Sequence, residues 1–186
     1  MSKSIITTQR GHSGSPWRII PKEAQIGEQC TVAATSDDTV FGDVVHATPG
    51  SVTTDIGGED SFMLTVTKPV SGVDDNVRAA GFFGVVQQVD GIDATAKGAV
   101  EFGPATLLVN VHTTSTADIP AGTALYVNYD EDNGTLGVYE TGAGDKAHKV
   151  VAITARAYTG LATNKTYQMW VHFDGIYGFG TRLANN

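Results

Sequence analysis

Apolar and polar residues alternate in short runs along most of the chain, and turn residues interrupt these runs every few positions. Alternation with a period of two is typical of a β-strand that buries one face. In the last run Tyr167, Met169, Val171 and Phe173 share one face, which we expect to be core. Trp170 then lies on the opposite face among polar neighbours, where a large apolar ring needs a cover. An N-terminal segment of the same chain or a contact with another molecule would supply it.

The pattern predicts an all-β fold, a sandwich or barrel of short antiparallel strands. The predicted strands cover residues 29–35, 39–47, 61–67, 81–89, 100–112, 123–129, 135–140, 148–159 and 166–173. Clusters of turn residues separate them at 36–38, 48–51, 56–60, 71–76, 90–98, 114–122 and 163–165. No fixed-period repeat is visible, although similar Gly-punctuated strand pairs recur.

The first 28 residues differ from the rest, because they are mostly polar, carry several Gly and Pro residues, and hold the apolar anchor "WRII". We interpret residues 1–28 as an extended N-terminal arm that docks on something through Trp17, Ile19 and Ile20. Residues 29–186 then form a β-rich domain. A division of this domain into two subdomains, with a boundary near 72–80, stays open.

Composition narrows the classes of partner. The chain has 186 residues, 41% of them hydrophobic, and a formal net charge of -8. A globular core is therefore expected, whereas binding to a nucleic acid backbone is not, because no basic cluster offsets the acidic charge. Cys30 is the single cysteine, so one chain forms no internal disulfide. No apolar run is long enough to span a membrane or to act as a secretory signal, and we expect a soluble protein made in the cytoplasm.

Motifs that resemble catalytic or metal sites fail in detail. The segment "GHSGSP" would make Ser13 a protease nucleophile, but His12 stands where Asp belongs, and the motif lies at the start of the chain. The five histidines are scattered without metal-ligand spacing. Adjacent acidic pairs fall in predicted turns, where the side chains point apart. We therefore expect a protein that is not an enzyme, with no catalytic residues, no bound cofactor and no metal.

The acidic stretch "DEDNG" is the nearest approach to a cation site. In a calcium-loop alignment Asp130 and Asp132 fit, but Gly134 falls at the fifth position, where a ligand belongs. A hairpin explains more, because alternation runs up to the break and resumes after it, and Asn133-Gly134 suits positive φ. We favour the hairpin, and cation binding at this turn stays open.

The run "IPAGTALYVNYDEDNGTLGVYE", followed by "KVVAITARAYTG" and "YQMWVHFDGIYGFG", resembles tailed-phage head decoration proteins, also called capsid cement proteins. In that family an Ala-Gly-led apolar strand, a short acidic turn, a further strand and a closing apolar strand recur. Residues 121–127 match the first of these. The resemblance runs from "GFFGVV" at Gly81 onward; Arg156 departs from it, and the front third has no counterpart.

The resemblance implies a β-rich structural protein of a bacteriophage virion, often a homotrimer, on the capsid exterior. Its partners would be its own copies and the major capsid protein, whose neighbouring subunits it would brace. We expect contacts with the capsid or between subunits at Trp17, Ile19, Ile20 and Trp170.

Two other functions stay open. A carbohydrate- or receptor-binding β module of a tail fibre would stack sugars on exposed aromatic rings, for which Tyr126, Tyr139, Tyr158 and Trp170 are candidates. A tail-tube subunit would instead polymerise into rings. These functions differ in the assembly that the purified chain would form.

Overall fold

The computed structural model describes residues 18–19, 28–33, 38–53, 63–69, 81–113, 118–128, 134–138, 148–179 and 181–182. Within these residues every regular element is a β-strand, which confirms the predicted all-β class. The strands are β1 (Arg18–Ile19), β2 (Glu28–Val32), β3 (Val44–Thr53), β4 (Met63–Thr67), β5 (Phe82–Val86), β6 (Lys97–Glu101), β7 (Ala105–Thr113), β8 (Ala124–Val127), β9 (Leu136–Val138), β10 (His148–Thr154), β11 (Lys165–Phe173) and β12 (Thr181–Arg182).

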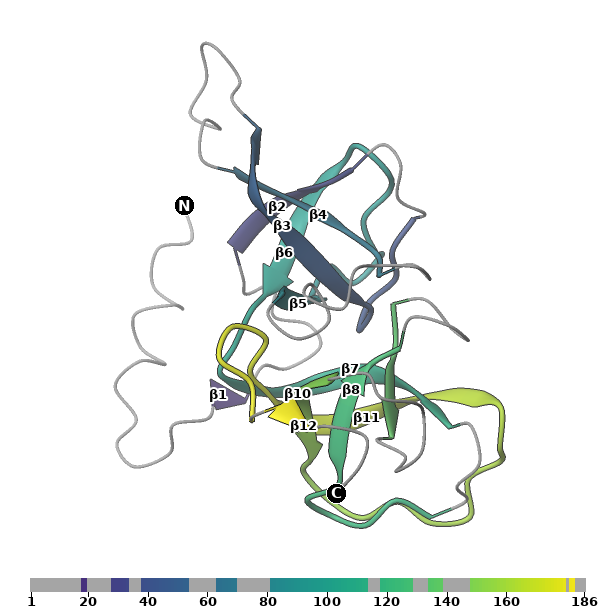
Figure 1. Ribbon diagram of the computed structural model, residues 1–186. Coiled ribbons are helices and arrows are strands. Elements are labelled where there is room, and N and C mark those ends of the chain that lie inside the picture. The colour runs from purple at the N-terminus through teal and green to yellow at the C-terminus, as the bar shows by residue number, and fades with distance from the viewer. Residues whose placement is uncertain are drawn as a thin grey trace.

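The strands form two closed barrels, one above the other in Figure 1. Barrel 1 has the strand order β2-β4-β3-β5-β6 and closes on itself. Barrel 2 has the order β7-β11-β10-β8-β9 and closes because β9 also pairs with β7. Closure leaves no free sheet edge along most of these strands, so their backbone groups are paired within the chain.

The two barrels have the same topology. In barrel 1, β2 pairs with β4 in parallel and with β6 antiparallel, and the remaining pairs β3–β4, β3–β5 and β5–β6 are antiparallel. Barrel 2 repeats every one of these pairings with β7 to β11 in the places of β2 to β6. The chain is therefore an internal structural duplication, which the sequence pattern did not reveal.

The duplication extends to the register of the strands. In barrel 1, Val66 of β4 pairs with Val32 on one side and with Ala47 on the other. The equivalent row of barrel 2 has Leu136 of β9 between Val111 and Val127. All six side chains are buried, so each row is a cross-section of a barrel core. The rows share their apolar character but few of their residues.

Each barrel also has the same turn before its second strand. We call residues 38–43 the first corner turn and residues 118–123 the second corner turn. Gly42 has φ +86° and Gly122 has φ +80°, a conformation that favours glycine. The glycine N–H donates to the last carbonyl of the neighbouring strand, at 3.0 Å to β5 in barrel 1 and 2.8 Å to β10 in barrel 2.

An aspartate opens both corner turns and makes the same bond. Asp38 Oδ1 accepts from the backbone N–H of Ala94 at 2.9 Å. Asp118 Oδ1 accepts from the N–H of Gly160, also at 2.9 Å. The next residue of each turn, Thr39 or Ile119, forms an isolated β-bridge with the loop that precedes the last strand of its barrel. The same local chemistry thus builds both corners.

Barrel 1 ends and barrel 2 begins at residues 102–104, between β6 and β7. The single strand predicted over 100–112 is therefore wrong. Gly103 has φ +91°, outside the β region, and Pro104 has no N–H for a ladder, so pairing stops here despite apolar residues on both sides. The alternative subdomain boundary near 72–80 falls among residues outside the described ranges.

Of two further sequence predictions, one is wrong and one is confirmed. The turn predicted at 48–51 is wrong, because β3 continues through it with an irregularity between Ala47 and Val52. The hairpin around the acidic stretch is confirmed, since β8 and β9 pair antiparallel and Gly134 has φ +84°. Residues 130–133 at its tip lie outside the described ranges.

The cores of the two barrels meet through β3 and β5. The inward side chains of β5, such as Val86, belong to the core of barrel 1. Val44, Phe83 and Val85 face the other way and join the apolar cluster of barrel 2. From Phe83 onward both faces of β5 are covered, so this part of its sequence "FFGVV" is continuously apolar rather than alternating.

Candidate functional site

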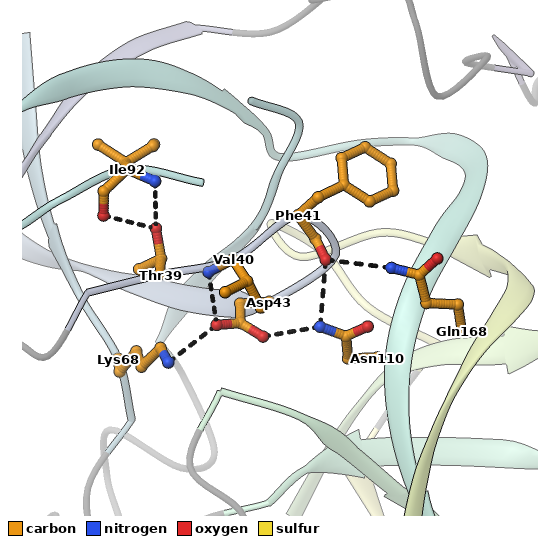
Figure 2. A network of polar contacts seen from close by, with 8 residues as sticks. All are labelled: Thr39, Val40, Phe41, Asp43, Lys68, Ile92, Asn110 and Gln168. Carbon is orange, nitrogen blue, oxygen red and sulfur yellow. Dashed lines mark hydrogen bonds and ion pairs between the residues drawn. The ribbon is translucent and has the colours of Figure 1, made fainter. Parts of the chain in front are cut away.

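The most elaborate polar arrangement in the described residues lies where the first corner turn enters barrel 2. Figure 2 shows the Asp43 carboxylate between Lys68 and Asn110. Its Oδ2 accepts from the Val40 N–H at 3.0 Å and pairs with Lys68 Nζ at 2.9 Å, while its Oδ1 accepts from Asn110 Nδ2 at 2.8 Å. Asp43 is buried, and these donors compensate the loss of water around its charge.

Asn110 holds the turn from the barrel 2 side. It lies on β7 in the gap between the short partner strands β1 and β9, which pair only with residues 105–106 and 111–112. Its backbone N–H donates to Gly42 O at 2.9 Å, and its Nδ2 also donates to Phe41 O at 3.2 Å. The gap in the edge of β7 is thus filled by the turn of barrel 1.

Gln168 on β11 adds a further amide at this contact. Its Nε2 donates to Phe41 O at 3.4 Å, and Gln168 is the register partner of Asn110 across β7 and β11. The corner turn therefore offers carbonyl and carboxylate oxygens, and barrel 2 offers amide donors. These bonds form a joint that positions the two barrels. No pattern within either sequence segment indicates that the two segments contact each other.

A buried lysine closes a second contact between the barrels. Lys149 of β10 donates through Nζ to Gly81 O at 3.1 Å, to Gly175 O at 2.9 Å and to Ile176 O at 2.6 Å. Desolvation by burial lowers the pKa of Lys149, and the nearby Asp174 carboxylate opposes this in part. Three carbonyls from two separate segments thus converge on one ammonium group.

The histidines of the described strands face threonines rather than each other. His46 contacts Thr67 Oγ1 at 3.2 Å, and each of the other two likewise meets a Thr directly across its strand pair, at 3.1 Å for His112 and 2.8 Å for His172. Burial lowers the pKa of His46, and a hydrogen bond with the Thr67 backbone opposes this in part. His12 and the His148 side chain lie outside what the structure describes. In the described ranges, no three His, Cys, Asp or Glu residues gather as a metal site would require.

Of the four contact residues expected from the sequence, the structure describes two. Trp17 and Ile20 lie outside the described ranges. Ile19 belongs to β1, which pairs in parallel with β7 opposite Thr106. Because β1 lies at the edge of β7, its two residues, Arg18 and Ile19, extend the sheet beside β7. They do not cross the face that carries Trp170.

Trp170 lies on β11 and is half-buried. Its register partner on β7 is Leu108. The ring therefore has one apolar neighbour on the adjacent strand, and its other neighbours there are polar. Its backbone N–H donates to Tyr158 Oη at 2.5 Å, and Arg156 stacks over the Tyr158 ring. The predicted core face of β11 is confirmed, because Met169, Val171 and Phe173 are fully buried and Tyr167 packs against them.

Four large apolar side chains are exposed among the described residues, and no pattern in the sequence marks them as exposed. They are Val40 at 56%, Phe82 at 43%, Val89 at 41% and Tyr177 at 82% exposed. Phe82 and Tyr177 follow Gly81 and Ile176, whose carbonyls bind the same Lys149 ammonium, so both lie beside that contact. The only sequence signal for Tyr177 is its place in the Gly-rich turn "GIYGFG".

Neither models of known protein families nor curated protein sequences give a match to this chain. In the part of the chain that the structure describes, no helix is long and apolar enough to cross a membrane.

Proposed function

We propose that this chain is a capsid cement protein of a tailed bacteriophage, a structural virion protein and not an enzyme. It binds the capsid exterior, most simply as a homotrimer, and stabilises contacts between neighbouring major capsid subunits. Its arm, with Trp17, Ile19 and Ile20, and Trp170 on the barrel contribute contacts. The proposal begins with the family resemblance of residues from Gly81 onward.

The observation that supports this proposal best is the combination of a buried joint with exposed apolar side chains. A cement protein must hold contact surfaces at fixed separations, because an ordered linker between binding surfaces lowers the entropy lost on binding. The Asp43 network and the Lys149 contact join the barrels through buried bonds. Val40 and Tyr177 stay exposed and are available for burial against capsid subunits.

The alternative of a sugar-binding module gains less support. Of its candidate rings, Tyr158 uses its hydroxyl within the chain and Tyr126 is half-buried, while Tyr139 lies outside the described ranges. A ring that is packed and hydrogen-bonded has little free face for stacking. Binding on a glycan array would nevertheless favour this module, and its loss in Trp170→Ala would locate the site.

Binding to empty, expanded capsids of the same phage tests the main proposal. We expect saturable binding of the purified chain and a higher melting temperature of the loaded capsids. A chain that lacks residues 1–20 should bind more weakly, with the intact chain as control. Absence of binding at every salt concentration and pH would refute the proposal. Native mass measurement adds a second criterion, since a discrete trimer agrees with capsid decoration, whereas a ladder of rings favours a tail tube.

A further inference from the structure

The two corner turns have the same local structure but different surroundings. A Cβ added at Gly42 would meet Asn110 Oδ1 at 3.1 Å and the Asn110 backbone N at 3.3 Å. A Cβ added at Gly122 would meet no atom within 4 Å. The first corner turn is therefore packed against barrel 2, whereas the tip of the second, Ala121 and Gly122, is exposed in the described structure.

The first corner turn, which is docked on barrel 2, shows which groups a turn of this kind uses for binding. Phe41 O and Gly42 O accept hydrogen bonds from the edge of β7 and from two side-chain amides. The corresponding carbonyls of the second turn belong to Ala121 and Gly122, both exposed. In the described part of the chain no group donates to either of these oxygens. Unpaired exposed carbonyls in a fixed turn are ready acceptors for a strand edge.

In a second copy of the chain, the β7 gap and its equivalent on β2 are both occupied in the described residues. The gap on β7 is already filled by that copy's own first corner turn. The equivalent stretch of β2 is covered, because Cys30 pairs with Leu64 of β4. We therefore consider as partner a different protein that presents backbone N–H groups at a strand edge.

We infer that the second corner turn is a docking element for the major capsid protein, which it binds as the first corner turn binds β7. Ala121 O and Gly122 O would accept from N–H groups at an exposed strand edge of a capsid subunit. The small Ala121 in place of Phe41 lets such an edge approach closely, and Thr123 in place of Asp43 removes the need for a buried cation. This inference rests on the proposed function and assigns it a specific surface.

Substitution of Ala121 tests the inference. Ala121→Arg adds bulk and charge at an exposed position, so folding should be unaffected and the melting temperature of the free chain unchanged. We expect its affinity for expanded capsids to fall by about tenfold or more, because the added side chain blocks close approach. The control is Val89→Arg, at an exposed position of barrel 1 in the loop between β5 and β6. The control should bind within about twofold of wild type.

A photo-crosslinking amino acid provides a second readout that does not depend on a loss of affinity. Placed at position 121 it should crosslink to the capsid subunit, whereas at position 89 in barrel 1 it should not. Equal capsid affinity of Ala121→Arg and wild type would overturn the inference and leave the proposed function intact. Failure of the wild type to bind capsids would overturn both. A changed mass of the free oligomer in Ala121→Arg, with capsid affinity unchanged, would assign the turn to contacts between copies and contradict the inference.

Discussion

Removal of the Asp43 carboxylate should weaken the joint between the barrels more than any surface change. Asp43→Ala eliminates the acceptor for Val40 N–H, Asn110 Nδ2 and Lys68 Nζ. Loss of one partner from a fully buried ion pair costs about 3–5 kcal/mol. Asn110 Nδ2 keeps its bond to Phe41 O, and the Lys68 side chain is 16% exposed and can regain water, so we expect the lower end, about 3 kcal/mol.

The internal duplication supplies the control for this experiment. Thr123 occupies the place of Asp43 in the second corner turn, and its hydroxyl donates only to Pro120 O, at 2.7 Å in an exposed position. Thr123→Ala should therefore cost less than about 1 kcal/mol. For a chain of this size, Asp43→Ala should lower the melting temperature by about 6–12 °C in calorimetry. Urea titration of both variants gives the free energies of unfolding directly. Equal destabilisation by the two substitutions would refute the role assigned to the joint.

Three further predictions concern the second contact, the pH response and the duplicated cores. Lys149→Met should lower the free energy of unfolding by about 2–4 kcal/mol, because it removes a charged donor from three buried or part-buried carbonyl contacts; no change in the urea midpoint would contradict this. Burial lowers the pKa of His46 below 6.5 in the folded chain. As the pH falls, the imidazole is therefore protonated first in the unfolded chain, so the contribution of His46 to stability is complete above pH 6.5 and is lost as the pH drops towards the folded pKa. His46→Gln should flatten this slope in urea titrations between pH 7.5 and 5, and an unchanged slope would exclude His46. Leu136→Ala should cost about 3 kcal/mol and Val66→Ala, its equivalent in barrel 1, about 2 kcal/mol; a negligible effect of either in calorimetry would show that the row is not core.

The sequence predicted the strands because alternation is a local property of each segment. The run from Tyr167 to Phe173 is the clearest case, and its core face is confirmed. The break at Gly103 was missed, since apolar residues continue on both sides and only the Gly-Pro pair marks the end of pairing. The sequence left open whether the strands form a sandwich or barrels. Closure depends on which strands meet and not on the pattern within any one strand.

The duplication was invisible in the sequence for a physical reason. The two corner turns read "DTVFGD" and "DIPAGT" and share only the aspartate that caps a loop and the glycine with positive φ. Buried rows need only apolar side chains of suitable volume, so they diverge freely. The joint was equally hidden, since Asp43 and Asn110 lie 67 positions apart and neither carries a local signal of the other.

The segment after β11 has a consequence for the order in which the protein matures. Gly175 accepts from Phe83 N–H at 3.1 Å and donates to Phe102 O at 3.0 Å, so it links β5 to the residue that follows β6. A ribosome releases barrel 1 before it adds Gly175, so the Phe83 N–H and the Phe102 carbonyl of the growing chain lack this partner until then. The half that is synthesised first is thus finished last. A nascent chain stalled before residue 174 should stay sensitive to protease in barrel 1, and release of the full chain should protect both halves together.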